Sequence, residues 1–392
     1  MKLMKKIPEY DADFYSDSFI KNPQPHYAEM RKLGPVVYLT AHNNFALTHY
    51  ATVKAALRNH TDFVSGLGVA GDDAGSKILR GNIVASDPPR HSEMRKVMLP
   101  TLAPKTLENL RGQFDSLAND VVHYLLGRDE FDVVAELAAV LPLNVVRELV
   151  GLPETGKDNM LKWAGAAFNI LGVQNERGKE ALASMQEMRA FITEKLTAEN
   201  VQKGSWAARV FELAEKGEIS EEHAAFLVRD YIGPSLDTTI SAICHLLEQL
   251  SHHPAQWTLL RSRPELGKRA ISEAIRLGTP IRSFARIAAR DIEVEGIVIP
   301  EGSRVMMLFA SANRDEMVFE NSDQFDLERP VAEHLGFGHG IHTCVGAHLA
   351  QMEMQAVLKA MLSQVEKIDI LEAVPLLNNT ISGFSVLRGK IR

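Results

Sequence analysis

The chain has 392 residues, of which 45% are hydrophobic and 24% charged, and its formal net charge is -7. This composition is typical of a folded globular protein, and the negative charge argues against a general nucleic-acid binder, which is usually basic. Two cysteines are too few for a secreted disulfide scaffold and favour a reducing cytoplasm. The N-terminus lacks the apolar core of a signal peptide, and Glu136 and Pro142 interrupt the most apolar stretch, so we expect no membrane span.

Helical patterns dominate the chain, with two β regions. The first β region is a predicted hairpin over residues 34–50, with an Asn-Asn pair at its turn. The second covers residues 286–308 and contains two Glu-Gly turns. Apolar residues that return every three or four positions predict helices over 104–126, 133–151, 157–172, 179–199, 220–252 and 265–277. We therefore expect a mainly α fold with a small β component, in a single domain over residues 1–392.

The predicted helix over residues 220–252 contains Pro234, which removes one helical hydrogen bond, so we expect a kink there. Asp237 and Thr238 follow within about a turn. Such a pair is usually an exposed feature of a helix surface. Two polar residues beside a kink in an otherwise apolar helix, however, require a partner or a function. Cys244, further along the same helix, is expected to pack in the core.

Cys344 lies in a segment that contains four glycines, at positions 336, 338, 340 and 346. Glycines let the backbone turn tightly and approach a flat ligand closely. A helical pattern begins at Val345, so Cys344 is expected at a helix N-terminus, where unpaired N–H groups and the helix dipole favour a thiolate. A thiolate held in this way can bind iron. A buried, inert thiol is the ordinary fate of a lone cysteine, but the glycines and His342 favour a ligand.

The segment Phe337-Gly338-His339-Gly340-Ile341-His342-Thr343-Cys344-Val345-Gly346 resembles the haem-binding loop of the cytochrome P450 superfamily, in its soluble bacterial type. This resemblance implies the cytochrome P450 fold, a triangular helical prism around haem b. It implies that Cys344 is the axial ligand of the haem iron, and that Phe337, Gly338 and Gly346 belong to the haem-binding loop. The implied activity is that of an oxidoreductase, a monooxygenase that uses dioxygen.

Two further motifs agree with this family. Glu273 and Arg276 share one face of a predicted helix, and by itself such a pair is usually solvated and of little value. The resemblance implies that both form a structural triad with Arg329. Similarly, His91 and Arg95 share a face of the helix that Asp87 is expected to cap, and the simplest interpretation is two exposed polar side chains.

The resemblance implies that the second motif binds the haem propionates. His91, Arg95, Arg286 and His342 would then form a cationic set suited to carboxylates. It also implies that Asp237 and Thr238 are the acid–alcohol pair that protonates the bound dioxygen. Thr238 would hold the oxygen and a water, and Asp237 would relay protons from solvent. This chain has Pro234-Ser235 where the family usually has Ala-Gly, so we expect an altered dioxygen groove.

Within the family, the chain most resembles the subgroup that removes methyl groups from para-methoxybenzoates. The implied substrate pocket contains Leu67, Ile83, Val84, Phe168, Leu171, Asp230, Gly233, Pro234, Ile281 and Phe284. The apolar members are equally compatible with ordinary core packing. Leu67 stands where that subgroup carries an arginine, and Asp230 and Gly233 replace serines. Because an aspartate repels a benzoate and accepts a hydrogen bond from a hydroxyl, we expect a neutral aromatic substrate, such as a methoxyphenol or alkylphenol.

The sequence therefore predicts a cytoplasmic enzyme of aromatic compound catabolism that hydroxylates or O-dealkylates a small apolar or aromatic substrate. Electrons would come from a separate ferredoxin or flavodoxin with an NAD(P)H-dependent reductase, docked near Arg95, Lys96 and His348. Two alternatives stay open. A peroxide-driven hydroxylase needs no acid–alcohol relay, so the Asp237-Thr238 pair counts against it. A non-catalytic haem sensor or carrier is the other, and Pro234-Ser235 keeps it open.

Overall fold

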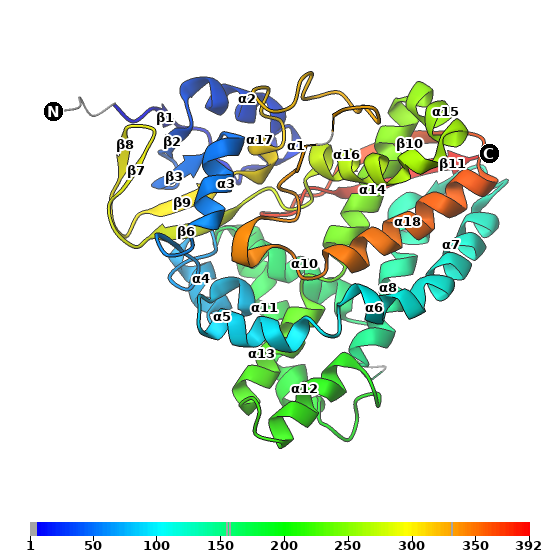
Figure 1. The fold of residues 1–392 in the computed structure, drawn as a ribbon, viewed down its shortest axis with the longest axis horizontal. Helices are drawn as coiled ribbons and strands as arrows, with labels where there is room; N and C mark the ends of the chain where they lie inside the picture. The colour runs from blue at the N-terminus through cyan, green and yellow to red at the C-terminus, as the bar shows by residue number, and fades with distance from the viewer. Residues whose placement is uncertain (1–5, 154–155, 157, 331) are drawn as a thin grey trace.

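The computed structural model describes residues 6–153, 156, 158–330 and 332–392. Residues 1–5 of the basic N-terminus and residue 157, where one predicted helix begins, lie outside the described residues. The molecule has a roughly triangular outline, with one group of strands toward the N-terminal corner, another near the C-terminus, and helices filling the rest (Figure 1). This arrangement confirms the expected mainly α fold with a small β component.

The largest sheet is mixed and has the strand order β1-β2-β3-β9-β6-β4. Its strands are β1 (Glu9–Tyr10), β2 (Val36–Leu39), β3 (Asn44–Leu47), β4 (Phe63–Val64), β6 (Phe284–Ala288) and β9 (Arg304–Met307). The predicted hairpin over 34–50 is confirmed: β2 and β3 pair antiparallel, and Asn43 at their turn has a φ of 53°. The second predicted β region is also confirmed, by antiparallel β6 and β9.

Two smaller sheets complete the β structure. Strands β7 (Ile292–Val294) and β8 (Ile297–Ile299) form a hairpin. Strands β10 (Ile368–Pro375), β11 (Phe384–Ile391) and β5 (Phe131–Asp132) form an antiparallel sheet in which β11 is central.

The described helices account for most of the predicted ones, with shorter bounds. They are α1 (Asp17–Lys21), α2 (Gln24–Leu33), α3 (Tyr50–Arg58), α4 (Asp73–Leu79), α5 (Arg90–Met98), α6 (Pro104–Leu107), α7 (Arg111–Leu125), α8 (Val140–Val150), α10 (Met160–Ile170), α11 (Glu176–Ala190), α12 (Trp206–Glu215), α13 (Glu221–Ile232), α14 (Asp237–His252), α15 (Pro254–Ser262), α16 (Gly267–Gly278), α17 (Phe309–Ala312) and α18 (Ala347–Gln364). Helix α8 is preceded by a π-helical turn (Val133–Ala138), and α11 is followed by another (Phe191–Lys195). A 3₁₀ helix, η1, spans Ile83–Ala85.

The prediction of one kinked helix over 220–252 is wrong, because α13 ends at Ile232 and α14 begins only at Asp237. Pro234 lacks an N–H group and its ring collides with the preceding turn. Side chains take over the carbonyls that helical N–H groups leave free: Ser235 Oγ donates to the Tyr231 carbonyl, and Thr238 Oγ1 donates to the Pro234 carbonyl at 3.0 Å. The chain is therefore interrupted beside the expected dioxygen site.

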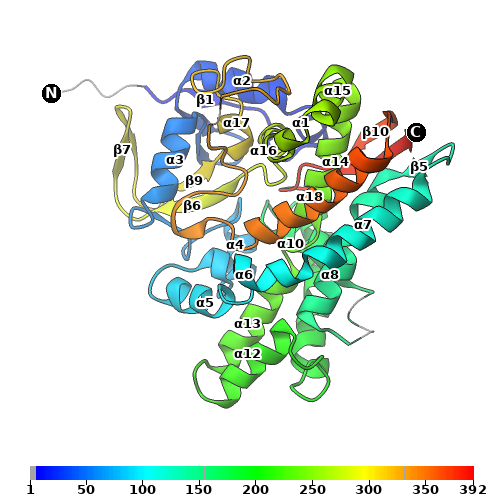
Figure 2. The same cartoon turned by 45° about the vertical axis from the view of Figure 1, so that its right-hand side comes forward.

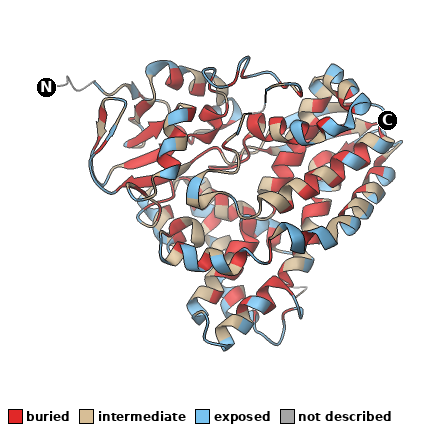
Figure 3. Cartoon of the chain, in the orientation of Figure 1, coloured by how far each residue is buried: buried red, intermediate tan, exposed pale blue. Residues whose placement is uncertain are grey.

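Helix α14 runs through the centre of the molecule, where it packs against α16, α18 and β10. Figures 1 and 2 both show α14, α16 and α18 as neighbours, and Figure 3 shows that buried residues concentrate along them. Cys244 on α14 is 1% exposed, which confirms its expected core position. None of the helices in the described part of the chain has the length and apolarity needed to cross a membrane.

Candidate functional site

A cavity of about 270 Å³ lies between the cysteine loop and the helices that surround it. Residues from α5, α10, α13, α14, α18, η1 and the start of β6 line its wall. Cys344 and Thr238 both belong to the lining, although they are more than a hundred positions apart in the sequence. The fold therefore brings the thiol and the alcohol of the predicted site to one cavity.

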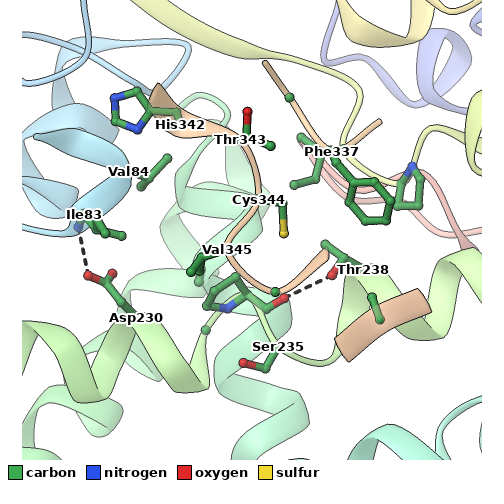
Figure 4. A pocket seen from close by; sticks show the side chains of 18 of the residues that line it. Ile83, Val84, Asp230, Ser235, Thr238, Phe337, His342, Thr343, Cys344 and Val345 are labelled. Atoms are coloured by element: carbon green, nitrogen blue, oxygen red, sulfur yellow. Dashed lines mark hydrogen bonds between the residues drawn. The ribbon is translucent and has the colours of Figure 1, made fainter. Parts of the chain in front are cut away.

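The cysteine loop ends at the start of α18, as the sequence predicts. A hydrogen bond from the Cys344 N–H to the Phe337 carbonyl, 2.8 Å long, closes the loop. Gly338 and Gly340 have φ values of 69° and 73°, a region that favours glycine, and a Cβ on Gly340 would lie 2.4 Å from the Leu57 carbonyl oxygen. Figure 4 shows the Cys344 sulfur pointing into the cavity. The loop therefore presents the sulfur as a ligand.

The expectation that the helix start favours a thiolate is supported in direction, because the N–H groups at the start of α18 lower the pKa of the Cys344 thiol, although burial opposes them. Because the cavity lies deep in the protein, burial raises the pKa of the Cys344 thiol. The N–H groups of Gly346 and Ala347 at the start of α18 and the Arg95 guanidinium lower that pKa, but they do not outweigh burial. A coordinated metal deprotonates a thiol outright, so the thiolate of this site depends on a bound cation.

The four predicted propionate ligands meet on one wall of the cavity. His91, Arg95, Arg286 and His342 all line it. Arg95 donates to the Thr343 carbonyl at 2.6 Å, Arg286 donates to the Ala285 carbonyl at 2.7 Å, and His342 Nε2 lies 3.1 Å from Ser65 Oγ. None of the four forms an ion pair with any carboxylate among the residues described. Two guanidinium groups and two imidazole rings thus line the cavity without an ion pair among the described residues.

The protonation states of this wall reflect the missing negative charge. Burial, with the Arg95 charge acting in the same direction, lowers the pKa of His91 to about 4. Burial and the charges of Arg286, His91 and Arg95 lower the pKa of His342 to about 2. Both ring nitrogens of His91 are buried and have no hydrogen-bond partner in the described structure. Buried polar atoms are normally satisfied, so this wall fits the carboxylates of a haem.

Asp87 does not cap α5, which begins at Arg90, so that prediction is wrong. Its carboxylate accepts instead from the N–H groups of Ser65 and Gly66, at 3.0 and 2.7 Å. The same turn explains why the prediction for Leu67 is wrong. A hydrogen bond from the Gly68 N–H to the Ser65 carbonyl closes the turn at 3.0 Å. Leu67 lies at its tip, is 61% exposed and does not line the cavity.

The other predicted pocket residues all line the cavity. They are Ile83, Val84, Phe168, Leu171, Asp230, Gly233, Pro234, Ile281 and Phe284. Further apolar lining comes from Met98, Met185, Met188 and Trp206, which the sequence did not single out. These four side chains lie on α5, α11 and α12, and their helical pattern does not distinguish a cavity wall from ordinary core.

The acid and the alcohol of the predicted relay face different surroundings. Thr238 lines the cavity, whereas Asp237 does not. The Asp237 carboxylate lies toward α10, where a Cβ on Gly165 would be 3.3 Å from its Oδ2 atom. Burial raises the pKa of Asp237 to about 7. The pair therefore offers a hydroxyl to the cavity and, one residue away, a carboxyl group that holds its proton up to near-neutral pH.

The predicted triad is brought together behind the cavity. Arg276 donates two hydrogen bonds of 2.8 Å to the Glu273 carboxylate, and Arg329 donates a third of 2.8 Å. Burial opposes the charge on Glu273, but the two guanidinium groups hold its pKa below the usual value. Arg276 is 2% exposed and also donates to the carbonyls of Asn313 and Ser322. The triad thus connects α16 to the segment that precedes the cysteine loop.

Asp230 is bound within the protein, so the expectation that it is a free acceptor for a substrate hydroxyl is not supported. Asn82 Nδ2 donates to its Oδ1 atom and the Ile83 N–H donates to its Oδ2 atom, both at 2.8 Å. Burial raises the pKa of Asp230 to about 7, although the Ile83 N–H and the Arg229 charge act in the opposite direction. The carboxylate joins α13 to η1.

Two charged residues that line the cavity were missed by the sequence reasoning. Arg229 stacks on the Phe226 ring at 4.1 Å, and its Nε atom has no hydrogen-bond partner. Glu353 on α18 is 1% exposed, its Oε1 atom has no partner, and burial raises its pKa to about 8. For Glu353 a signal exists, because it is four residues after the buried Leu349 and therefore lies on the same face of the helix that follows Cys344.

Comparisons with known proteins agree with this geometry. A family model described as cytochrome P450 matches residues 260–381. The chain is 34% identical to cytochrome P450 CYP199A2 of Rhodopseudomonas palustris over 388 residues, which cover 97% of this chain and 94% of that protein. It is 32% identical to linalool 8-monooxygenase of Pseudomonas putida over 306 residues, with coverages of 76% and 74%.

Solved structures share the fold. The TM-score is 0.80 to CYP109B1 from Bacillus subtilis, which is 28% identical, with 95% of this chain and 100% of that chain covered. It is 0.86 to epothilone D-bound P450epoK, which is 23% identical, with coverages of 98% and 99%. Because the likeness to CYP199A2 covers 97% of the present chain, this chain belongs to the cytochrome P450 family, the monooxygenases whose cofactor is haem b.

Proposed function

We propose that this protein is a haem-thiolate monooxygenase that inserts one oxygen atom from dioxygen into a small aromatic substrate, by hydroxylation or O-dealkylation. The observation that carries the proposal is the single cavity shared by the Cys344 sulfur, the cationic wall and an apolar lining. When bound, the haem supplies the activation of dioxygen. The residues of the chain hold the cofactor, exclude water and deliver protons.

Cofactor binding is assigned to the loop and to the cationic wall. Cys344 is the axial ligand, and Phe337, Gly338 and Gly346 form the surface of the loop beside it. His91, Arg95, Arg286 and His342 bind the propionates, whose negative charge relieves the mutual repulsion of these groups and satisfies both nitrogens of His91. The Glu273–Arg276–Arg329 triad keeps the loop in place by holding the preceding segment against α16.

Proton delivery is assigned to Thr238 and Asp237. The Thr238 hydroxyl donates its hydrogen to the Pro234 carbonyl, and on the cavity wall its oxygen accepts from a water of the relay. Asp237 holds a transferable proton near neutral pH and feeds it from the side of α10. The hydrogen bonds of Ser235 and Thr238 stabilise the interrupted helix, so the departure from the usual Ala-Gly pair is compatible with this relay.

The substrate is assigned from the lining. Phe168, Leu171, Ile281 and Phe284, with Ile83 and Val84, offer apolar and aromatic surface. Such a wall binds a flat apolar ring by burial and by aromatic contact. The names of relatives, linalool 8-monooxygenase among them, support oxygen insertion into small apolar molecules.

Electrons are assigned to a separate ferredoxin or flavodoxin with an NAD(P)H-dependent reductase. The exposed Lys96 on α5 supports an acidic partner on that face. Arg95 lines the cavity and donates to the Thr343 carbonyl, so Lys96 carries this docking proposal, and a contribution of Arg95 stays a prediction.

The test combines a binding screen with turnover. Small phenols, aryl ethers, benzoates, fatty acids and terpenes are titrated against the ferric holoprotein, and the change in haem spin state is recorded. Compounds that bind are incubated with a ferredoxin, its reductase and NADPH, and the products are identified by mass spectrometry with labelled dioxygen. We expect one labelled oxygen atom in a hydroxylated product, or in the aldehyde that O-dealkylation releases, and no product from Cys344→Ser. Reductant consumption without any oxidised product across the panel contradicts the proposal and favours a sensor or carrier. Faster turnover with peroxide than with the reductase favours the peroxide-driven alternative.

A further inference from the structure

We infer that Asp230 is a positioning residue that shapes the substrate cavity by fixing Asn82 and Ile83, without itself binding the substrate. This inference rests on the proposed function, because it concerns the same cavity. The Asp230 carboxylate lies on α13 and is 6% exposed. Both of its oxygens accept hydrogen bonds from the segment 82–83, at 2.8 Å each, and Figure 4 shows the bond to the Ile83 N–H. We call these two hydrogen bonds the Asp230 tether.

The tether supplies the cap that η1 lacks. Asn82 occupies the position that precedes η1, where an asparagine side chain usually accepts a hydrogen bond from its own helix, but here it makes no such bond. Its amide and the first N–H of η1 both donate to Asp230 instead. Free N–H groups at a helix start require a hydrogen-bond acceptor, and a carboxylate is the strongest acceptor among the side chains. The start of η1 therefore depends on a residue 147 positions away in the sequence.

The neighbouring turn of α13 holds the same segment by packing. Phe226 precedes Asp230 by four residues and so shares its face of the helix. A Cβ on Gly81 would lie 2.3 Å from the Phe226 ring, so the ring contacts the backbone of Gly81 directly. The Arg90 guanidinium lies over the Phe226 ring, 5.2 Å from its centroid, and donates to the Gly81 carbonyl at 3.3 Å. One face of α13 thus binds residues 81–83 over two successive turns.

This attachment determines where two cavity residues lie. Ile83 and Val84 are the first two residues of η1, and both side chains line the cavity (Figure 4). Their position relative to the ring-binding wall follows from the position of η1. The affinity of a ligand that is long enough to contact Ile83 and Val84 depends on the tether, whereas the affinity of a ligand that contacts only the iron does not. Asp230 therefore acts on specificity through the wall, in contrast to the direct hydroxyl acceptor expected from the sequence.

The experiment uses two probes that bind the ferric holoprotein through the same nitrogen. Imidazole occupies the iron alone, and phenylimidazole adds a ring that reaches the apolar wall. Spectral titration gives a dissociation constant for each probe. In Asp230→Leu, which keeps the branched shape but removes both acceptors, we expect phenylimidazole to bind about tenfold more weakly, the effect of one lost charged hydrogen bond, and imidazole to stay unchanged.

Matched variants separate positioning from direct contact. In Asp230→Asn the amide oxygen accepts from the Ile83 N–H and a rotated Asn82 side chain accepts from the new amide, so we expect near wild-type binding of both probes. Asn82→Ala removes one of the two hydrogen bonds of the tether, and we expect it to weaken the binding of phenylimidazole alone, by about twofold to threefold. This variant also keeps the experiment informative if Asp230→Leu does not hold haem. The losses are expected to be less than additive in the double variant. Asp115→Asn, which removes an exposed ion pair to Lys359, is the control.

Three results would overturn the inference: an unchanged phenylimidazole constant in Asp230→Leu and Asn82→Ala, an equal loss for both probes, or a loss in Asp230→Asn as large as in Asp230→Leu. The last result means that the charge of Asp230 contacts the ligand directly. None of these measurements uses turnover. Failure of the proposed function appears separately, as the absence of the red-shifted ferrous–carbon monoxide band of a thiolate-ligated haem in the wild-type protein.

Discussion

Replacing Glu273 by alanine is expected to destabilise the protein strongly. The substitution removes the shared partner of Arg276 and Arg329 and leaves the Arg276 guanidinium, which is 2% exposed, without a counter-charge. Breaking a buried ion pair on one side costs about 3–5 kcal/mol. Arg276 keeps its bonds to the carbonyls of Asn313 and Ser322, so we expect the lower end of that range, about 3 kcal/mol. The free energy of unfolding of a typical domain is about 5–15 kcal/mol, so the variant loses a large fraction of its stability.

The assay is urea unfolding of the holoprotein, followed in parallel by tryptophan fluorescence and by haem absorbance. A protein with a bound cofactor is not strictly two-state, so the comparison uses transition midpoints at an unchanged slope. With a slope of about 3 kcal/mol per molar, we expect the midpoint to fall by about 1 M. Glu328→Ala is the matched control: Glu328 adjoins Arg329 but pairs with Arg263 at the surface, where water screens the interaction, and no measurable shift is expected. Equal shifts in the two variants would refute the reasoning.

Three other predictions follow from the buried groups of the cavity. The His91→Phe variant should release haem about tenfold faster, as measured by stopped-flow transfer to apomyoglobin. The melting temperature of the haem-free protein should not change, because the His91 nitrogens have no hydrogen-bond partner in the protein. The rate of product formation should fall as the pH rises through about 7, where Asp237 loses its proton. The Asp237→Asn variant should form product more slowly, and its pH–rate profile should lack this fall. For Glu353 the folded state keeps a proton that the unfolded state releases, so stability should fall as the pH rises from 4.5 to about 8. Glu353→Gln should remove that slope from urea midpoints, and an unchanged slope would contradict the assignment.

Local patterns predicted much of the site because the chemistry is contiguous in the chain. The glycines around Cys344 and the helical pattern that follows it lie within one short segment, and the structure has the loop and helix α18 where they were expected. Glu273 and Arg276 are one helical turn apart, so their shared face follows from the spacing alone. The same holds for His91 and Arg95 on α5.

Predictions failed where side-chain hydrogen bonds, local in one case and from a distant segment in the other, decided the path of the backbone. Pro234 was expected to kink a helix, but side-chain hydrogen bonds from Ser235 and Thr238 stabilise an open turn there. Leu67 was assigned to the pocket from the resemblance to the para-methoxybenzoate subgroup, but Asp87 holds its turn in a position that exposes it. In both cases the deciding partner was a polar group whose target cannot be identified from periodicity.

The amino-acid sequence by itself predicted the family and the candidate iron ligand, because a thiolate loop needs its glycines, its cysteine and its helix start next to one another in the chain. Only the tertiary structure decided the roles of Asp230, which the sequence placed near the polar end of a substrate, and of the adjacent Arg229, which the sequence reasoning missed. Folding gives Asp230 two donors from η1 and leaves an Arg229 nitrogen without a partner. The physical reason is burial: once water is removed, the available partners determine what a polar group does, and those partners come from anywhere in the chain.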